Sequence, residues 1–146
     1  MTTRARDGTV RAREVAHTAD VGFEVEAPTL ATLFEHAGLT LEALMVDLTT
    51  DAPSASIAIT IEADTREELL HDWLQELLVR YQVDGFVACE LAVDLVDDRH
   101  VRGSATGERY DPARHRAHEE VKGVTYHQLA VRPTTGGWAA RVILDV

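Results

Sequence analysis

The sequence predicts a single-domain α+β protein, a two-layer sandwich in which a mixed or mainly antiparallel sheet carries two helices on one face. Two segments repeat apolar residues at steps of three and four, as amphipathic helices do. About seven others alternate apolar and polar residues or are short apolar runs, the pattern of strands. The length of 146 residues fits one domain with a real core. The expected order is two strands, a helix, a strand, a helix and four strands.

The N-terminal part begins with a polar stretch, and we expect residues 1–9 to form a flexible extension and residues 10–146 to form the domain. A strand is expected near residues 9–15 and a second near 22–26. Between them lies the segment His17-Thr18-Ala19-Asp20. It is either a turn held by its own side-chain hydrogen bonds or a site.

Both predicted helices have capping residues at their ends. Thr29 is placed to cap the first helix, and Asp64 or Thr65 to cap the second, with a glutamate three residues on as in a capping box. Gly85 ends the second helix. The apolar stripes of the two helices are Leu30, Leu33, Phe34, Ala37, Leu41, Leu44 and Met45, then Leu69, Leu70, Trp73, Leu74, Leu77, Leu78 and Tyr81.

The remaining strands follow from alternation and from turn residues between the runs. Glycine and proline mark the boundaries, and the segment 133–137 reads as a hairpin loop. These strands are expected at residues 57–61, 86–96, 100–110, 121–131 and 138–146.

Composition excludes several classes of protein. The net charge of −11 argues against nucleic-acid binding through a broad basic face, because phosphates would be repelled. It fits a protein that meets a basic partner or holds a cation. The single cysteine, Cys89, excludes an intrachain disulfide and a thiolate zinc site, and we expect it in the core. No apolar run is long enough to span a membrane, and no secretory signal precedes the domain, so a cytoplasmic location is expected.

The end of the sequence suggests a cation site. Asp145 is followed directly by the terminal carboxylate of Val146, and two such anions repel unless something compensates them. A third carboxylate from Asp20 would complete an oxygen-rich site for a hard divalent ion. His17 could add a nitrogen ligand or a supporting hydrogen bond. The alternative is a solvated, frayed end.

Other polar residues carry weaker signals. Lys122 and His127 lie on one predicted strand but point to opposite faces, which weakens an acid–base role. His115 and His118 lie among arginines in what reads as a solvated turn. Asp72 is expected at the rim of the second helix, where it could pair with a strand residue. Neither a phosphate-binding glycine loop nor a nucleophile elbow occurs, so stand-alone catalysis has little support.

Four segments in order resemble the archease family, and together they cover nearly the whole chain from about Val10. Their shared order makes the resemblance specific, whereas any one alone would be weak. The four segments are His17–Gly22 with the helix start at 29–34, Leu69–Leu78 with its Asp72-Trp73 pair, Glu120–His127, and Ile143–Val146.

The resemblance implies a protein cofactor of the RtcB-type RNA-splicing ligase, which joins 2′,3′-cyclic-phosphate or 3′-phosphate ends to 5′-hydroxyl ends using GTP and Mn²⁺. Such a cofactor promotes guanylylation of the ligase and multiple turnover in tRNA splicing or RNA repair. The resemblance also implies a metal site at Asp20, Asp145 and Val146, with Ca²⁺ expected in a crystal and Mg²⁺ or Mn²⁺ as alternatives. His17, Lys122 and His127 are assigned supporting roles. The chain itself is expected to be neither an enzyme nor a nucleic-acid binder.

Two other functions stay open from the sequence. One is a metal-dependent hydrolase of small phosphorylated substrates built on the same carboxylates. The other is a chaperone-like binding module with no chemistry. Turnover by the isolated protein would separate the hydrolase from the other two.

Overall fold

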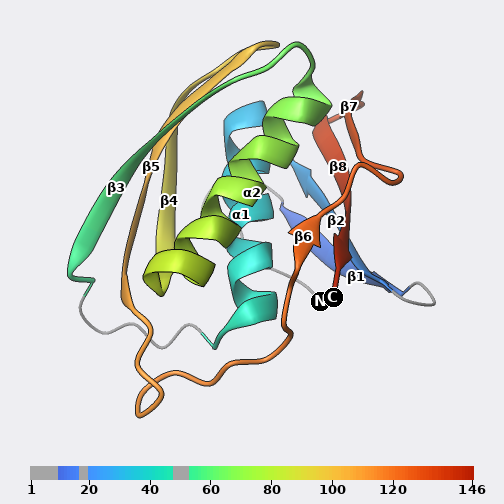
Figure 1. Cartoon of the computed structure of the whole chain (residues 1–146). Helices are drawn as coiled ribbons and strands as arrows, with labels where there is room; N and C mark the ends of the chain where they lie inside the picture. The colour runs from blue at the N-terminus through green and yellow to red at the C-terminus, as the bar shows by residue number, and fades with distance from the viewer. Residues whose placement is uncertain (1–9, 17–19, 48–52) are drawn as a thin grey trace.

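The strands form two antiparallel sheets, and the two helices lie between them (Figure 1). The computed structural model describes residues 10–16, 20–47 and 53–146. The elements in chain order are β1 (Arg11–Ala16), β2 (Asp20–Ala27), α1 (Leu30–Met45), β3 (Ala55–Glu62), α2 (Arg66–Asp84), β4 (Phe86–Val96), β5 (His100–Arg109), β6 (Gly123–Val124), β7 (Ala130–Thr134) and β8 (Gly137–Asp145).

The first sheet has the order β1-β2-β8-β6, and β7 pairs with β8 further along the same edge as β6. The second sheet has the order β3-β5-β4. All pairings between these strands are antiparallel. The expected α+β class with two helices and mainly antiparallel strands is confirmed, and each sheet has the helices on one face.

The helix ends follow the sequence expectations. Thr29 caps α1 by accepting from the amide of Thr32, and Thr65 caps α2 by accepting from the amide of Glu68. Gly85 ends α2 with φ of 67°, a left-handed conformation in which a side chain would be strained. Local chemistry therefore specifies the start of both helices and the end of α2.

The core lies between the helices and the two sheets. Trp73 of α2 is fully buried, and its indole Nε1 donates to the carbonyl of Phe34 in α1 at 3.0 Å. From the C-terminal strand, the core receives the alternate residues Ala140, Val142 and Leu144. The opposite residues of β8 therefore lie on the outer face of the first sheet.

The edge of β4 is covered by α1. Two helix carboxylates accept from strand amides: Glu35 from the amide of Val93 at 2.9 Å, and Glu42 from the amide of Ala88 at 3.0 Å. Acidic side chains thus take the place of a neighbouring strand along this edge.

One expected strand is wrong in its extent. The region 121–131 contains only the two-residue β6, followed by a turn and the start of β7. Thr125 accepts from the amide of His127, Leu129 donates to the carbonyl of Tyr126, and Gln128 has φ of 52°. Local hydrogen bonds of the threonine hydroxyl therefore end the strand that alternation predicted.

Candidate functional site

Asp20 and Asp145 are direct partners across the first sheet. Asp20 opens β2, Asp145 closes β8, and the register of the antiparallel pair places them opposite each other. Directly opposed residues of an antiparallel pair project to the same face, with Cβ atoms about 5 Å apart. Asp145 is exposed and Asp20 is half-buried. We call this pair the carboxylate rung.

No described cation neutralises the carboxylate rung. Among the described residues, neither aspartate side chain has an ion pair or a hydrogen-bond partner. The next charged pair on the same face differs, because Glu24 accepts from Arg13 at 2.8 Å and lies 4.0 Å from Arg141. Like charges opposed across strands are destabilising. Among the described residues the rung is therefore without a compensating charge, whereas Glu24 on the same face has two arginine partners.

A third strand reaches the rung from the other side of β8. Gly123 of β6 is also a register partner of Asp145, and the amide of Lys122 donates to the Asp145 carbonyl at 2.7 Å. The Lys122 side chain is exposed, and it makes no ion pair with either aspartate of the rung. The backbone of Lys122 thus belongs to the site, whereas its ammonium group does not neutralise it.

The other predicted site residues are placed as follows. His127 is exposed and lies in the turn after β6. Val146 is half-buried and packs against the core. His17 lies outside the described residues. Within residues 10–16, 20–47 and 53–146, no three His, Cys, Asp or Glu side chains are close enough to hold a metal ion.

The donor set nevertheless suits a hard cation in part. Two carboxylates on one face supply oxygen ligands, which Ca²⁺, Mg²⁺ and Mn²⁺ prefer. Two side chains alone leave most of the coordination sphere open. Completion by the terminal carboxylate of Val146 stays a prediction.

Two side chains of α2 hold β6 in place. The His71 Nε2 atom donates to the Val124 carbonyl at 2.8 Å, and Gln75 accepts from the Val124 amide at 3.2 Å. His71 Nδ1 lies 2.8 Å from a carboxylate oxygen of Asp72, and the ring stacks on Tyr126 with centroids 4.0 Å apart. We call these contacts the α2 clamp. Asp72 therefore pairs with its neighbour on the helix, not with a strand residue.

The α2 clamp positions the site indirectly. β6 has only two residues, so few ladder bonds of its own fix it against β8. Both nitrogens of His71 face acceptors, and both contacts form together only when each nitrogen carries a proton. The sequence signal was His71 and Gln75, two polar residues four apart on one helix face, which sequence reasoning passed over.

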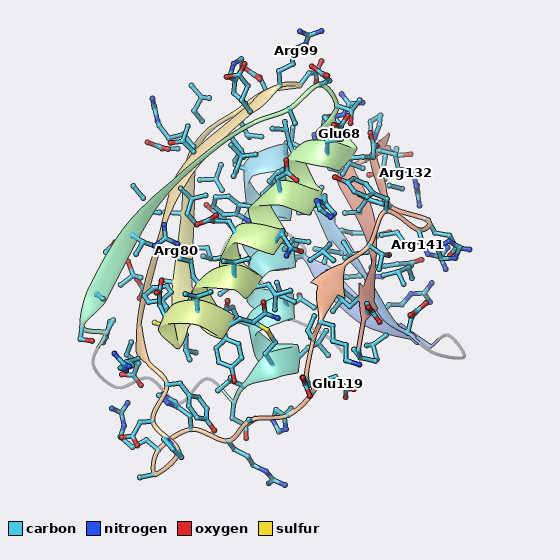
Figure 2. The ribbon with its side chains drawn as sticks, in the orientation of Figure 1. Glu68, Arg80, Arg99, Glu119, Arg132 and Arg141 are labelled. Atoms are coloured by element: carbon cyan, nitrogen blue, oxygen red, sulfur yellow. The ribbon has the colours of Figure 1, made fainter. Side chains whose placement is uncertain are left out.

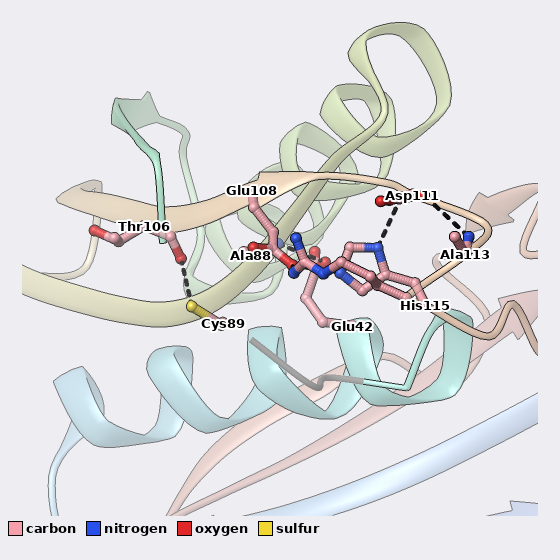
Figure 3. A network of polar contacts seen from close by, with 9 residues as sticks. Glu42, Ala88, Cys89, Thr106, Glu108, Asp111, Ala113 and His115 are labelled. Carbon is pink, nitrogen blue, oxygen red and sulfur yellow. Dashed lines mark hydrogen bonds and ion pairs between the residues drawn. The ribbon is translucent and has the colours of Figure 1, made fainter. Parts of the chain in front are cut away.

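A second polar cluster joins the end of β5 to the loop that follows it (Figure 3). Glu108 accepts from His115 Nε2 and from Arg114, and His115 Nδ1 accepts from the Asp111 amide at 2.8 Å. His115 is only 4% exposed, so its assignment to a solvated turn is wrong. The cause is Glu108, a buried acid that needs a hydrogen-bond donor.

Glu42 is buried nearby, and desolvation raises its pKa from 4.5 to about 8. The hydrogen bond from the Ala88 amide opposes that shift. Cys89, expected in the core, is only partly buried, and its thiol donates to the Thr106 carbonyl. This region links α1 to the second sheet.

Two hollows lie on the outer face of the first sheet. One of about 230 Å³ is lined by residues that include Gln128, Arg132 and Arg141, and one of about 520 Å³ lies beside Arg11 and Arg13. The described residues that line them include no serine, cysteine or histidine, and neither Asp20 nor Asp145 is among them. Within the described helices, none is both long and apolar enough to cross a membrane.

The sequence model of the Archease protein family (MTH1598/TM1083) matches residues 13–146. The chain belongs to the archease family. Protein archease of Methanopyrus kandleri is 40% identical over 136 residues, covering 91% of this chain and 97% of that protein. Protein archease of Pyrococcus furiosus is 34% identical over 134 residues, covering 89% and 94%.

Two solved structures share the archease fold. The solution structure of Methanobacterium thermoautotrophicum protein 1598 has a TM-score of 0.74 and 34% identity, covering 92% of this chain and 98% of that chain. The crystal structure of an archease from Thermotoga maritima, described as a possible chaperone, has a TM-score of 0.64 and covers 99% of both chains. Its identity of 16% supports the shared fold alone.

Proposed function

We propose that this archease-family chain is an accessory protein of an RtcB-type RNA ligase, promoting GTP-dependent guanylylation of the ligase and its multiple turnover. The observation that carries the proposal is the carboxylate rung, a pair of directly opposed aspartates at the end of the sheet that no described cation neutralises. Such a pair can take up a divalent ion or meet a cationic surface on a partner. Family membership supports the choice of partner.

The ion in this proposal is held by Asp20 and Asp145, with the carboxylate of Val146 as the third predicted ligand. When bound, a divalent ion would supply positive charge at the end of the sheet. The chain's own part is to hold two carboxylates at a fixed spacing, because β2 and β8 are hydrogen-bonded neighbours in the sheet. The α2 clamp adds rigidity by fixing β6 on the other side of Asp145.

The charge balance supports a protein partner instead of direct RNA binding. The chain has a net charge of −11, so RNA phosphates would be repelled while a basic RNA-binding face of a ligase would be attracted. The isolated protein should give no gel shift with short RNA at low micromolar concentration and physiological salt. A shift under those conditions would contradict this part of the proposal.

The decisive assay is formation of the ligase–GMP adduct with sub-stoichiometric archease-family protein. Asp20→Ala and Asp145→Ala should each abolish stimulation while the fold persists, because neither the half-buried Asp20 nor the exposed Asp145 makes a stabilising ion pair with a described residue. Glu26→Ala is the matched control, since Glu26 is an exposed acid on the same strand and the same face as Asp20. Stimulation by Asp20→Ala equal to that of the parent protein would show that the rung is not the working site.

The same preparation tests the hydrolase alternative. The isolated protein with Mn²⁺ should release no phosphate from small phosphate esters, because among the described residues no third His, Cys, Asp or Glu joins the two aspartates to act as a base on a metal-bound water. Release that disappears in Asp20→Ala would replace the proposal with the hydrolase.

A further inference from the structure

The edge of β3 is the least protected sheet edge of the described part of the molecule. Proteins usually blunt exposed edges with charges, proline, bulges or a covering element. β1 carries Arg11 and Arg13, β7 carries Arg132 and Pro133, and the short β6 is covered by the α2 clamp. These three edges therefore resist pairing with another strand.

Of the two edges of the second sheet, β4 is protected against pairing with another strand and β3 is not. β4 has two breaks in its register, and its amides are taken by Glu35 and Glu42 of α1. β3 pairs with β5 without a register break over all eight residues, from Ala55 to Glu62. It contains no proline, lysine or arginine, and its one charge is Glu62 at the end. In Figure 1, β3 forms the outermost strand at the left.

The hydrogen bonds of β3 show which groups face outward. The Ala63 amide donates to the Arg99 carbonyl at 3.0 Å, and alternate residues of an antiparallel ladder bond the same neighbour. Ile57, Ile59 and Ile61 therefore bond β5 through their main chain. The alternate residues point their amides and carbonyls to the open side, and they are exposed: Ser56, Ala58 and Thr60.

We propose that β3 is a homodimerisation edge, at which a second copy of this chain adds its own β3 antiparallel across a two-fold axis. Pairing Ala58 with Thr60 of the second copy places Ile59 on the axis. The same register sets Ile57 opposite Ile61 and Glu62 opposite Ser56, so apolar residues meet apolar ones and no like charges are opposed. The two three-stranded sheets become one continuous sheet.

The self-complementary register is what favours a second copy over a foreign strand. The single charge of the edge, Glu62, lies at its end and gives little selection for a charged peptide, whereas the three isoleucines match themselves when the strand is reversed. The contact involves one strand per copy, so the dimer belongs to the small, weak class of interfaces. Each copy carries −11, so salt should strengthen the association by screening the repulsion.

The dimer leaves the carboxylate rung free. The rung lies on the other sheet, on the far side of the helices from β3 (Figure 1). A dimer would therefore present two rungs at its outer ends. The inference does not depend on the proposed function, and either can fail without the other.

Sedimentation velocity of the full chain, from micromolar to millimolar concentration and at low and high salt, tests the proposal. We expect a monomer–dimer equilibrium whose dimer fraction rises with concentration and with salt. A monomer throughout that range would overturn it.

Two alanine variants locate the interface. Ala58 and Ala92 are both exposed alanines of the second sheet, on β3 and on β4. Ala58→Lys places two like charges near the two-fold axis and should raise the dissociation constant about tenfold. Ala92→Lys should leave the constant unchanged. Equal dissociation constants for the two variants would show that the dimer interface does not lie at β3 and would overturn the proposal.

Disulfide trapping tests the register. In a Cys89→Ala background, chains with Ala58→Cys and chains with Thr60→Cys are oxidised separately and as a mixture. Opposed residues have Cα atoms about 5.5 Å apart, within disulfide range, whereas diagonal ones lie beyond about 7 Å. A cross-linked dimer should form in the mixture alone. Equal cross-linking of each chain by itself would overturn the register.

Discussion

Asp20 and Asp145 face each other across two hydrogen-bonded strands although 124 residues separate them in the sequence. We expect the pair to destabilise the protein in the absence of a cation, because like charges directly opposed across strands repel. That cost gives the site a signature independent of any partner protein.

Replacing one aspartate of the rung should stabilise the metal-free protein. Asp20→Asn or Asp145→Asn removes the repulsion and keeps the side-chain shape, so the free energy of unfolding should rise by about 0.5 kcal/mol in EDTA. Urea unfolding measures it. Adding Ca²⁺ or Mn²⁺ should raise the melting temperature of the parent protein and not of either variant. A loss of stability in EDTA for both variants would show that the carboxylates already have a stabilising partner.

Removing the α2 clamp should loosen β6 before it unfolds the domain. His71→Ala leaves the Val124 carbonyl without its donor, which should cost about 1–3 kcal/mol. Hydrogen exchange should accelerate at the amides of Lys122 and Thr125, which bond β8. Glu76→Ala on the same helix, which loses only an ion pair with Arg80, is the control. Unchanged exchange at both amides would mean that β8 alone holds β6.

Glu42 should make stability depend on pH. Its pKa is raised by burial from 4.5 to about 8, so the folded protein keeps a proton that the unfolded chain releases. Its stabilising contribution is therefore present in full below pH 4.5 and is lost as the pH rises through about 8. Between these two pH values the free energy of unfolding should fall by up to about 1.4 kcal/mol per pH unit. Glu42→Gln, whose side chain is neutral at every pH, should reduce this pH dependence, and urea unfolding at several pH values measures the reduction. An unchanged slope in Glu42→Gln would assign the dependence to another group.

Gly107 should tolerate no side chain. A Cβ atom there would lie 1.9 Å from the Val87 carbonyl oxygen, so β4 and β5 would have to move apart. Gly107→Ala should lower the free energy of unfolding by several kcal/mol, about 2–4. Gly123→Ala is the matched control, because nothing lies within 4 Å of its Cβ position, and it should change stability by less than about 0.5 kcal/mol. Comparable losses in the two variants would argue against a close strand contact at Gly107.

Sequence reasoning performed best where local chemistry decides the structure. Thr29, Thr65 and Gly85 delimit the helices as expected, because caps depend on residues only a few positions apart. The proximity of Asp20 to Asp145 was also expected, from the charge argument and from the family resemblance. The metal itself, and the roles of Val146, His17, Lys122 and His127, stay predictions.

The errors come from partners distant in sequence. His115 looks like a solvated loop residue until Glu108, on the preceding strand, is seen to bury its carboxylate against it. The strand predicted over residues 121–131 failed because Thr125 bonds both the Ile143 carbonyl and the His127 amide. The alternation of apolar and polar residues predicts which side chains are buried, but it does not predict which main-chain groups a polar side chain will hydrogen-bond.

The position of β8 also constrains the order in which the protein can fold during synthesis. β8 lies between β2 on one side and β6 and β7 on the other, and it follows all of them in the chain. Until β8 has emerged from the ribosome, the β1–β2 hairpin has no third strand, and two-stranded ribbons are only marginally stable in water. The second sheet and both helices precede β8 entirely, so they can associate earlier. A nascent chain therefore cannot present the carboxylate rung before β8 has emerged and paired with β2.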